Sequence, residues 1–497
     1  MASGAKGLGF ESPQARHCKY RAGLSRRQLG SFYCMLLKGS DDLNVLTFSA
    51  ALLVFSVLGL GIAVSKKVGN VSDYTVAGKK AGVSGVVGVI MGALMGGAST
   101  VGTVQMAYKY GLSAWWFTLG GGVGCIILGL GFASRLREAN VTTIPGFLKK
   151  NYGMSVSIVS MIASSLGTYI AIVAQFLSGV ALLQSILPLS PFVSSMIVVF
   201  FVLGFLYLGG LKSYSLIGKV KIIMLFLTLG SSAALIFIQG ATPLCLIKSM
   251  PSSPFFNFFG AGISKGIGAF FSMIVGVFCT QIYLQGIFAA SDPQVARRGA
   301  LLAGVLIPPL GLMGVYIGLY MRSIGGSIDP AHALPIFIRL HFPPVVGGVF
   351  LAGIFITVVG AAAGLSFGVA TNLVQDFLNN ISYISQRMKG AKGLLLSRAT
   401  VAVIVVSAAC LGIVFRGDLI LNWSYLSMSL RGVGTFLPLI VALLYPGALS
   451  PFWAFLSAIA GLGAALMTPL FFHSVEPLFV GLLLSGILTF VGLFVGR

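Results

Sequence analysis

Acidic residues are scarce in this 497-residue sequence, and their scarcity excludes several classes of protein. The chain has 10 Asp and Glu residues against 32 Lys and Arg, and only 8% of its residues are charged. A soluble domain carries about 25% charged residues, so no large soluble domain is expected. The acids lie in tails, in loops or at the ends of apolar stretches. This placement argues against a carboxylate relay at membrane depth, which many pumps use.

Cysteine and histidine are also few, with 6 and 4 residues scattered along the chain. Their spacing contains no Cys-x-x-Cys pair and no Cys/His set, so we expect no metal site. Because no nucleophile and base lie together in an apolar stretch, we predict that the protein is not an enzyme and holds no cofactor. The net charge of +22 lies mainly in short loops, so nucleic acid is not an expected partner.

Long apolar runs are what the sequence has instead. Hydrophobic residues make up 57% of the chain, and the mean hydropathy is +0.99. Since a membrane helix needs roughly 20 apolar residues, we predict an all-α polytopic membrane protein with about thirteen transmembrane helices. The predicted spans are 43–64, 83–108, 114–133, 155–187, 190–209, 213–238, 262–289, 299–321, 345–376, 397–415, 421–445, 451–471 and 476–495.

Basic residues gather in alternate loops, and this pattern predicts the orientation of the chain. The basic clusters lie at 66–67, 79–80, 135–137, 149–150, 297–298 and 387–398. By the positive-inside rule, these loops are cytoplasmic, so we expect a cytoplasmic-membrane protein with its N-terminus outside and its C-terminus in the cytoplasm. The polar, basic tail 1–42 breaks the pattern and has no apolar signal segment. Our hypothesis is that translation begins at Met35 and that residues 1–34 are not native.

Several segments together carry a resemblance to a known family. In chain order they are "SDYTVAGKK" (72–80), "VIMGALMGGASTVGTVQMAYKYGLSAWW" (89–116), "ASRLREANVTTIPGFLKKNYG" (133–153), "YLGGLKSYSLIGKVK" (207–221), "QGIFAASDPQVARRGALLAG" (285–304), "AHALPIFIRLHFP" (331–343) and "GVFLAGIFITVVGAAAGLSFGVATNLVQDFL" (348–378). In this order and spacing, residues 43–470 resemble the sodium/solute symporter family. Its members carry proline, sugars, sialate, pantothenate or monocarboxylates.

The resemblance implies a LeuT-like fold built from two inverted repeats of five helices. These repeats would span 83–238 and 262–445. An extra transmembrane helix at 43–64 would precede them, and two C-terminal transmembrane helices within 451–497 would follow. Transporters of this type bind their solute near the midplane, where helices are broken.

The stretch "MGGAST" at 95–100 is our candidate for such a break. Each glycine weakens a helix by about 1 kcal/mol, and a broken helix offers free N–H groups to an anion. Close helix packing through small residues is the alternative interpretation. The candidate substrate-binding residues are Gly96, Gly97, Ser99, Thr100, Gln175, Thr280 and Gln281. The last three could equally bond to neighbouring helices.

The family resemblance also implies a sodium site, but the sequence departs from it. Backbone oxygens of Gly92, Met95 and Thr357 would hold the ion, while the two hydroxyl positions fall on Gly360 and Ala361. A nearby acid of the family falls on Gly218. This ion site is therefore degenerate. A hard cation needs several oxygen ligands, whereas about three carbonyls suit the three donors of an ammonium group. The family resemblance therefore implies sodium coupling, but the residues at this site argue against it.

Two lysines lie near this site, in "IGKVKIIM" at 217–224. Lys219 lies about 200° around the helix from Lys221, so both cannot point inward. Our hypothesis is that Lys221 acts as a surrogate cation, and a buried lysine that exchanges its proton would allow coupling to H⁺. Alternatively, the apolar run 222–238, about 25 Å long as a helix, nearly crosses the bilayer alone. Both lysines would then be edge charges.

Other basic residues also lie in apolar stretches. Lys265 is near a predicted boundary, where its side chain can reach the interface. Arg431 lies deeper in its span and could face the core and touch the substrate.

Together these features predict a secondary active transporter of a small organic solute, with a carboxylate or amino acid favoured. It would work by alternating access within the lipid bilayer. The alternatives are a sodium-independent or proton-coupled carrier or exchanger on the same fold and, less favoured, a transporter-like membrane sensor. The identity of the substrate and the oligomeric state are left open at this stage.

Overall fold

The structure is a computed structural model that describes residues 40–65, 79–207, 210–325, 328–373, 391–471 and 475–495. Within these ranges every named element is a helix, which confirms the predicted fold class. The proposed start at Met35 and nearly all of the basic tail lie outside the described residues.

The described helices overlap the predicted spans, although the span 83–108 is divided into several elements. The first part of the chain forms α3 (Ser40–Ser65), α5 (Val83–Leu94), η2 (Ala98–Gly102), α6 (Thr103–Tyr110), η3 (Gly111–Trp115), α7 (Trp116–Ile127), η4 (Leu128–Phe132), α8 (Ala133–Glu138), α9 (Ile144–Tyr152), α10 (Met154–Ile186), α11 (Pro191–Tyr207) and α12 (Gly210–Ile238). The second part forms α13 (Pro243–Ser249), α14 (Ser252–Phe255), α15 (Ile263–Cys279), α16 (Gln281–Phe288), α17 (Pro293–Ile324), η5 (Pro330–His332), α18 (Ala333–His341), α19 (Pro344–Thr371), α21 (Ala391–Val414), α22 (Ile420–Val433), α23 (Phe436–Leu444), α24 (Pro451–Phe471) and α25 (Pro477–Val495).

Many of these helices are long and apolar enough to cross a membrane. Among the described residues there are 7 such helices, or up to 9 if each of two bent helix pairs forms one span. Four shorter apolar helices, at Leu43–Ser56, Val83–Leu94, Pro191–Phe205 and Arg398–Val414, accompany them. The multi-pass character is therefore clear, while the count of about thirteen stays a prediction.

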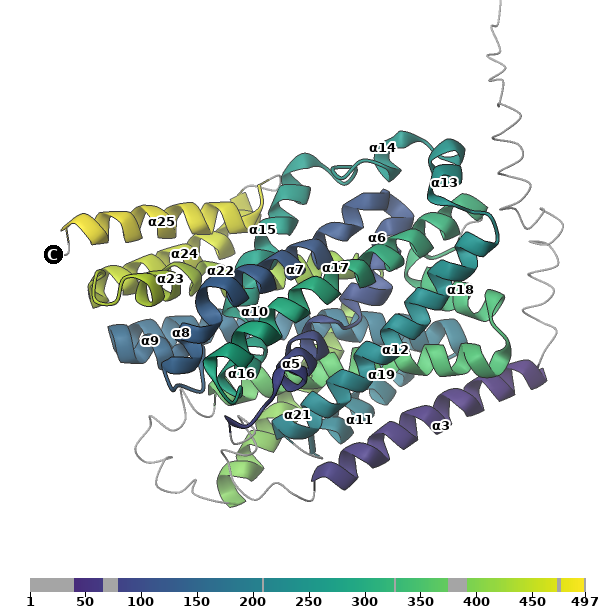
Figure 1. The fold of residues 1–497 in the computed structure, drawn as a ribbon, viewed down its shortest axis with the longest axis horizontal. Coiled ribbons are helices and arrows are strands. Elements are labelled where there is room, and N and C mark those ends of the chain that lie inside the picture. The colour runs from purple at the N-terminus through teal and green to yellow at the C-terminus, as the bar shows by residue number, and fades with distance from the viewer. Residues whose placement is uncertain are drawn as a thin grey trace, which may run out of the picture.

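The two ends of the described chain lie on opposite sides of the helix bundle. Figure 1 shows α3 along one side and the pair α24 and α25 along the other, with α5 between them near the centre. Residues 85–94 of α5 are all buried, and so are residues 351–371 of α19. Helices this apolar on every face belong in the interior of the bundle. The division into inverted repeats at 83–238 and 262–445 stays a prediction.

Local capping signals explain where several of these helices begin. α9 starts after Thr143, whose hydroxyl accepts a hydrogen bond from the Gly146 amide at 3.0 Å. α17 starts after Asp292, whose carboxylate accepts one from the Val295 amide at 2.9 Å. A proline stands within the first two positions of both helices, where its missing N–H costs nothing. The hydrogen bond from the Val295 amide holds the pKa of the Asp292 carboxyl below its usual range.

Candidate functional site

The first helix break lies where the glycine-rich stretch predicts it. α5 ends at Leu94, and Met95 has an extended backbone with φ −83° and ψ 92°. Side chains satisfy the backbone groups that the break releases. The Ser99 hydroxyl accepts from the Gly96 amide at 2.9 Å, and the Thr100 hydroxyl donates to the Gly96 carbonyl at 2.8 Å. Ser and Thr compete with helical hydrogen bonds in this way, which is why the helix yields here.

Gln175 on α10 completes this break. Its Oε1 accepts a hydrogen bond from the Gly97 amide at 2.7 Å. A Cβ on Gly96 would collide with the same Oε1 and would lie 2.6 Å from the Cβ of Ala361, and a Cβ on Gly97 would collide with Ser178. Only glycine allows the broken segment to approach α10 and α19 so closely. The structure therefore brings together five of the predicted substrate residues: Gly96, Gly97, Ser99, Thr100 and Gln175.

Lys221 is buried against this broken helix. Its side chain is only 1% exposed, and Nζ donates a hydrogen bond to the carbonyl of Gly92 on α5. A Cβ built on Gly360 of α19 would lie 3.2 Å from the same Nζ. The ammonium group thus lies between α5 and α19, beside residues at which the family resemblance places a sodium ion.

The other predicted ion-site residues are Thr357 and Ala361 on α19 and Met95 at the end of α5, and the one hydroxyl among them bonds within its own helix. Thr357 donates its hydroxyl to the Gly353 carbonyl of its own helix at 2.7 Å. Ala361 packs against Gly96 across the interface. Met95 provides the extended residue of the break. The position of the family's acid, Gly218, contacts the Gly88 backbone so tightly that a Cβ there would collide with the Gly88 carbonyl.

Lys219 differs from Lys221, as their helical spacing predicts. It is partly exposed, and its aliphatic stem lies over Gly88, since a Cβ built there would be 3.2 Å from Cγ of Lys219. One lysine of the pair is therefore buried in the helix interface, and the other lies at its margin.

The second break falls at Thr280, between α15 and α16. Its backbone is extended, with φ −94° and ψ 110°, and the two helices meet at a bend of 48°. Although Gly266, Gly268 and Gly276 lie in α15, none of them forms the break. The Thr280 hydroxyl donates to the Gly276 carbonyl at 2.6 Å and accepts from Nη1 of Arg431.

Arg431 on α22 is fully buried at this second break. Besides Thr280, it bonds to Ser427, through Nη2 to the hydroxyl and through Nε to the carbonyl at 3.2 Å. These partners are all neutral.

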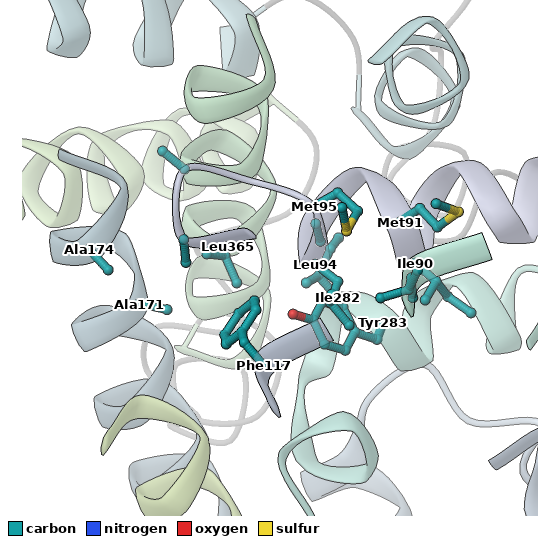
Figure 2. Packing of buried hydrophobic residues seen from close by; sticks show 14 of the residues in the cluster. Ile90, Met91, Leu94, Met95, Phe117, Ala171, Ala174, Ile282, Tyr283 and Leu365 are labelled. Atoms are coloured by element: carbon teal, nitrogen blue, oxygen red, sulfur yellow. The ribbon is translucent and has the colours of Figure 1, made fainter. Parts of the chain in front are cut away.

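Apolar side chains fill the space around the two breaks. Figure 2 shows Met91 and Leu94 of α5, Phe117 of α7, Ala171 and Ala174 of α10, Ile282 and Tyr283 of α16, and Leu365 of α19. Tyr283 turns its hydroxyl toward the side on which α10 lies. An apolar interior raises the strength of every polar contact made within it.

Gln281 is near the second break in sequence, but its side chain bonds to the segment before α9. Its Oε1 accepts from the Ile144 amide at 3.0 Å, and Nε2 donates to the Thr142 carbonyl at 3.0 Å. The sequence reasoning did not select Tyr283 or Ser178. Ser178 follows Gln175 by three residues and so shares its helix face, which was an available signal. Tyr283 offered no such signal.

Comparison with known proteins identifies the family that this chain resembles. A model of the sodium:solute symporter family matches residues 74–461. The sodium/proline symporter 2 of Staphylococcus saprophyticus is 24% identical over 422 residues, covering 79% of this chain and 80% of that protein. A sodium/proline symporter of Staphylococcus aureus is 23% identical over 432 residues, covering 81% of this chain and 82% of that protein.

Solved structures show the same fold. A substrate-bound, outward-open Na⁺-coupled sialic acid symporter superposes with a TM-score of 0.72 at 14% identity, covering 91% of this chain and 96% of that one. MHP1, a nucleobase-cation-symport-1 family transporter, gives 0.50 at 14% identity, covering 84% and 94%. The LeuT-like arrangement that the motifs implied is thereby confirmed.

Proposed function

Because the chain belongs to the sodium:solute symporter family, we propose that it is a secondary active transporter whose ion site is filled by its own lysine. It moves a small organic solute across the membrane by alternating access. The solute is a carboxylate or an amino acid, and it binds between the broken helices near Gly97, Thr100, Gln175 and Thr280.

The position of Lys221 is the observation that carries this proposal. An ammonium group has three donors and no acceptor, so it binds carbonyls as sodium does. Its Nζ donates a hydrogen bond to the Gly92 carbonyl, and Gly360 and Ala361 on α19 have no hydroxyl. A second cation in the same place would meet a fixed positive charge, which costs several kcal/mol at short range in a partly buried site. Transport would therefore not require sodium at this site, and a Lys221 that loses and regains its proton during the cycle would couple uptake to H⁺.

Sodium symport in the usual manner is the second candidate. The relatives named above are sodium/proline symporters, and the superposed sialic acid symporter is described as Na⁺-coupled. Uptake measured with and without a sodium gradient distinguishes this candidate from the proposal.

The proposed orientation is N-terminus outside and C-terminus in the cytoplasm, within the cytoplasmic membrane. The basic loops assigned to one side meet in the structure, which supports this orientation. Nζ of Lys79 donates to Oδ1 of Asn140 at 3.0 Å, and Nε of Arg137 donates to the Ala290 carbonyl at 2.6 Å. Ala81 pairs with Ala289 and Ser291 through backbone hydrogen bonds of 3.0 Å. Their shared excess of positive charge marks the cytoplasmic side.

The test begins with a thermal-shift screen of organic acids, amino acids and sugars, with and without sodium, to find a solute that binds. Uptake of that solute into proteoliposomes is then measured with a sodium gradient, a proton gradient or neither. We expect no stimulation by sodium, and we expect Lys221→Ala to lower uptake about tenfold or more because the buried Gly92 carbonyl loses its donor.

Lys219→Ala is the matched control, since it removes the same charge two residues away. It should leave uptake near the wild-type level. If only Lys219→Ala impairs uptake, or if neither change does, Lys221 does not replace the ion. Stimulation of the wild-type protein by sodium would favour the second candidate.

A further inference from the structure

Arg431 brings a positive charge into the interior, and none of the described carboxylates bonds to it. Its side chain is 0% exposed, and its hydrogen bonds go to Thr280 and Ser427. A buried cation is costly unless an anion compensates it. The close packing of Gly167 against Cγ of Arg431 holds the side chain in place.

The described acids do not supply this compensation. Glu138, Asp292, Asp329 and Asp418 are exposed, and Glu476 is only half-buried near Lys265. Lys221 adds a second buried cation, which likewise bonds to a neutral carbonyl. In the part of the chain that the structure describes, the interior therefore holds two positive charges and no buried carboxylate.

The backbone carbonyls at both breaks already accept hydrogen bonds from the chain itself. At the first break, Gly92 accepts from Lys221 and Gly96 accepts from Thr100. At the second, Gly276 accepts from Thr280 at 2.6 Å, and Cys279 accepts from the Ser164 hydroxyl at 3.3 Å. A solute ammonium would have to share these carbonyls with donors of the chain, in an interior that already holds two positive charges, and both conditions disfavour a cationic group there.

We propose that Arg431 binds the carboxylate of the transported solute, and that this solute is a net anion rather than a zwitterion. This inference rests on the proposed transport function and names the charge class that its site accepts. The guanidinium presents Nη1 and Nη2 in a planar fork that matches the two oxygens of a carboxylate. Both nitrogens now bond to hydroxyls, of Thr280 and Ser427, which a carboxylate can replace as acceptor.

The location of Arg431 gives this binding a route to transport. The side chain joins α22 to the extended residue between α15 and α16. A carboxylate that draws the guanidinium away from Thr280 would release this connection at the bend. Binding energy can then favour a different arrangement of the broken helix, provided that the solute binds the two arrangements unequally.

The test is equilibrium binding of small ligands to the purified protein, measured by thermal shift in sodium-free buffer. The probes are cyclopentanecarboxylate, its neutral amide and the zwitterion L-proline, which share a five-membered ring. Acetate, lactate, benzoate and glucuronate extend the range of carboxylate sizes. We expect at least one carboxylate to stabilise the wild-type protein, and we expect L-proline to bind at least tenfold more weakly than cyclopentanecarboxylate. The amide should give no shift.

Arg431→Gln should weaken binding of the stabilising carboxylate at least tenfold, whereas Arg431→Lys, which keeps the charge, should retain part of it. Arg339→Gln is the control, because Arg339 also donates to a carbonyl, that of Ser185 at 2.7 Å, but lies on α18. It should bind like the wild type. If Arg431→Gln does not fold, the comparison of Arg431→Lys with the wild type, and of carboxylate with amide, still decides the question.

The proposal is overturned if no carboxylate protects the wild-type protein, if Arg431→Gln binds as tightly as the wild type, or if L-proline matches cyclopentanecarboxylate. These outcomes differ from failure of the transport proposal. Carboxylate binding that depends on Arg431 without any flux in proteoliposomes would reject transport alone. Flux of a neutral or zwitterionic solute that ignores Arg431 would reject the anion site alone.

Discussion

The two helix breaks differ in how the chain satisfies them. At Gly96 and Gly97, side chains of Ser99, Thr100 and Gln175 satisfy the released backbone groups. At Thr280, by contrast, the main partner is the guanidinium of Arg431, which bonds to no carboxylate among the described residues. The side chains that bond to the first break are neutral, whereas we infer that the guanidinium at the second break gives it a capacity to bind an anion.

The two buried cations show the same contrast. The single ammonium of Lys221 finds a carbonyl of the kind that a sodium ion would use. The fork of Arg431 has five donors, and its acceptors in the chain are a carbonyl and hydroxyls. We infer that the chain itself supplies the partner of the Lys221 ammonium. The guanidinium of Arg431, by contrast, gains its anionic partner only when the solute binds.

The largest expected effect comes from rebuilding the sodium site. Lys221→Ala alone should abolish most uptake. Combining it with Gly360→Ser and Ala361→Ser introduces hydroxyls near the vacated Gly92 carbonyl, so uptake should return and depend on sodium. Proteoliposome uptake with and without a sodium gradient checks this. If the triple variant is no more sodium-dependent than Lys221→Ala, the lysine does not occupy an ion position.

A medium effect should distinguish the two glutamines near the breaks. Gln175→Leu leaves the buried Gly97 amide without its acceptor, at a cost of about 1–3 kcal/mol. We expect KM for uptake to rise about tenfold. Gln281→Leu loses two bonds to the segment before α9, which should lower the melting temperature and leave KM unchanged. The reverse result would move the solute site toward Gln281.

The smallest effect concerns the N-terminal end of α15, where a cation does have an acid nearby. Burial raises the pKa of Glu476 above its ordinary value of 4.5, although Lys265 opposes this shift. A raised pKa in the folded state stabilises the protein below pH 4.5, and this contribution is lost as the pH rises through the folded pKa. The melting temperature of Glu476→Gln should therefore change less than that of the wild type as the pH rises from 4.5 through the folded pKa. Equal slopes would contradict the expectation.

The first break was predictable because its causes are local. Adjacent glycines followed by Ser99 and Thr100 weaken a helix wherever they occur. The second break was not predictable, because single threonines such as Thr357 also lie within continuous helices of this chain. Its extended backbone is accompanied by the bond from Arg431, which is 151 positions away in sequence.

The fate of "IGKVKIIM" shows the same division. Its helical spacing already required Lys219 and Lys221 to face different ways. Spacing did not decide whether either lysine was buried, because the apolar run at 222–238 was compatible with both answers. Contact with Gly92 and the absence of a side chain at Gly360 decided it.

Hydropathy and charge pattern along the chain were enough to determine a multi-pass helical membrane protein, since transfer into lipid is a nearly additive property of successive residues. Ordered motifs were enough to indicate its family. Which charges lie in the interior, and what each one faces, depended on the tertiary structure. Such contacts join α5 to α12 and α15 to α22, and their energies depend on neighbours that no local stretch of sequence contains.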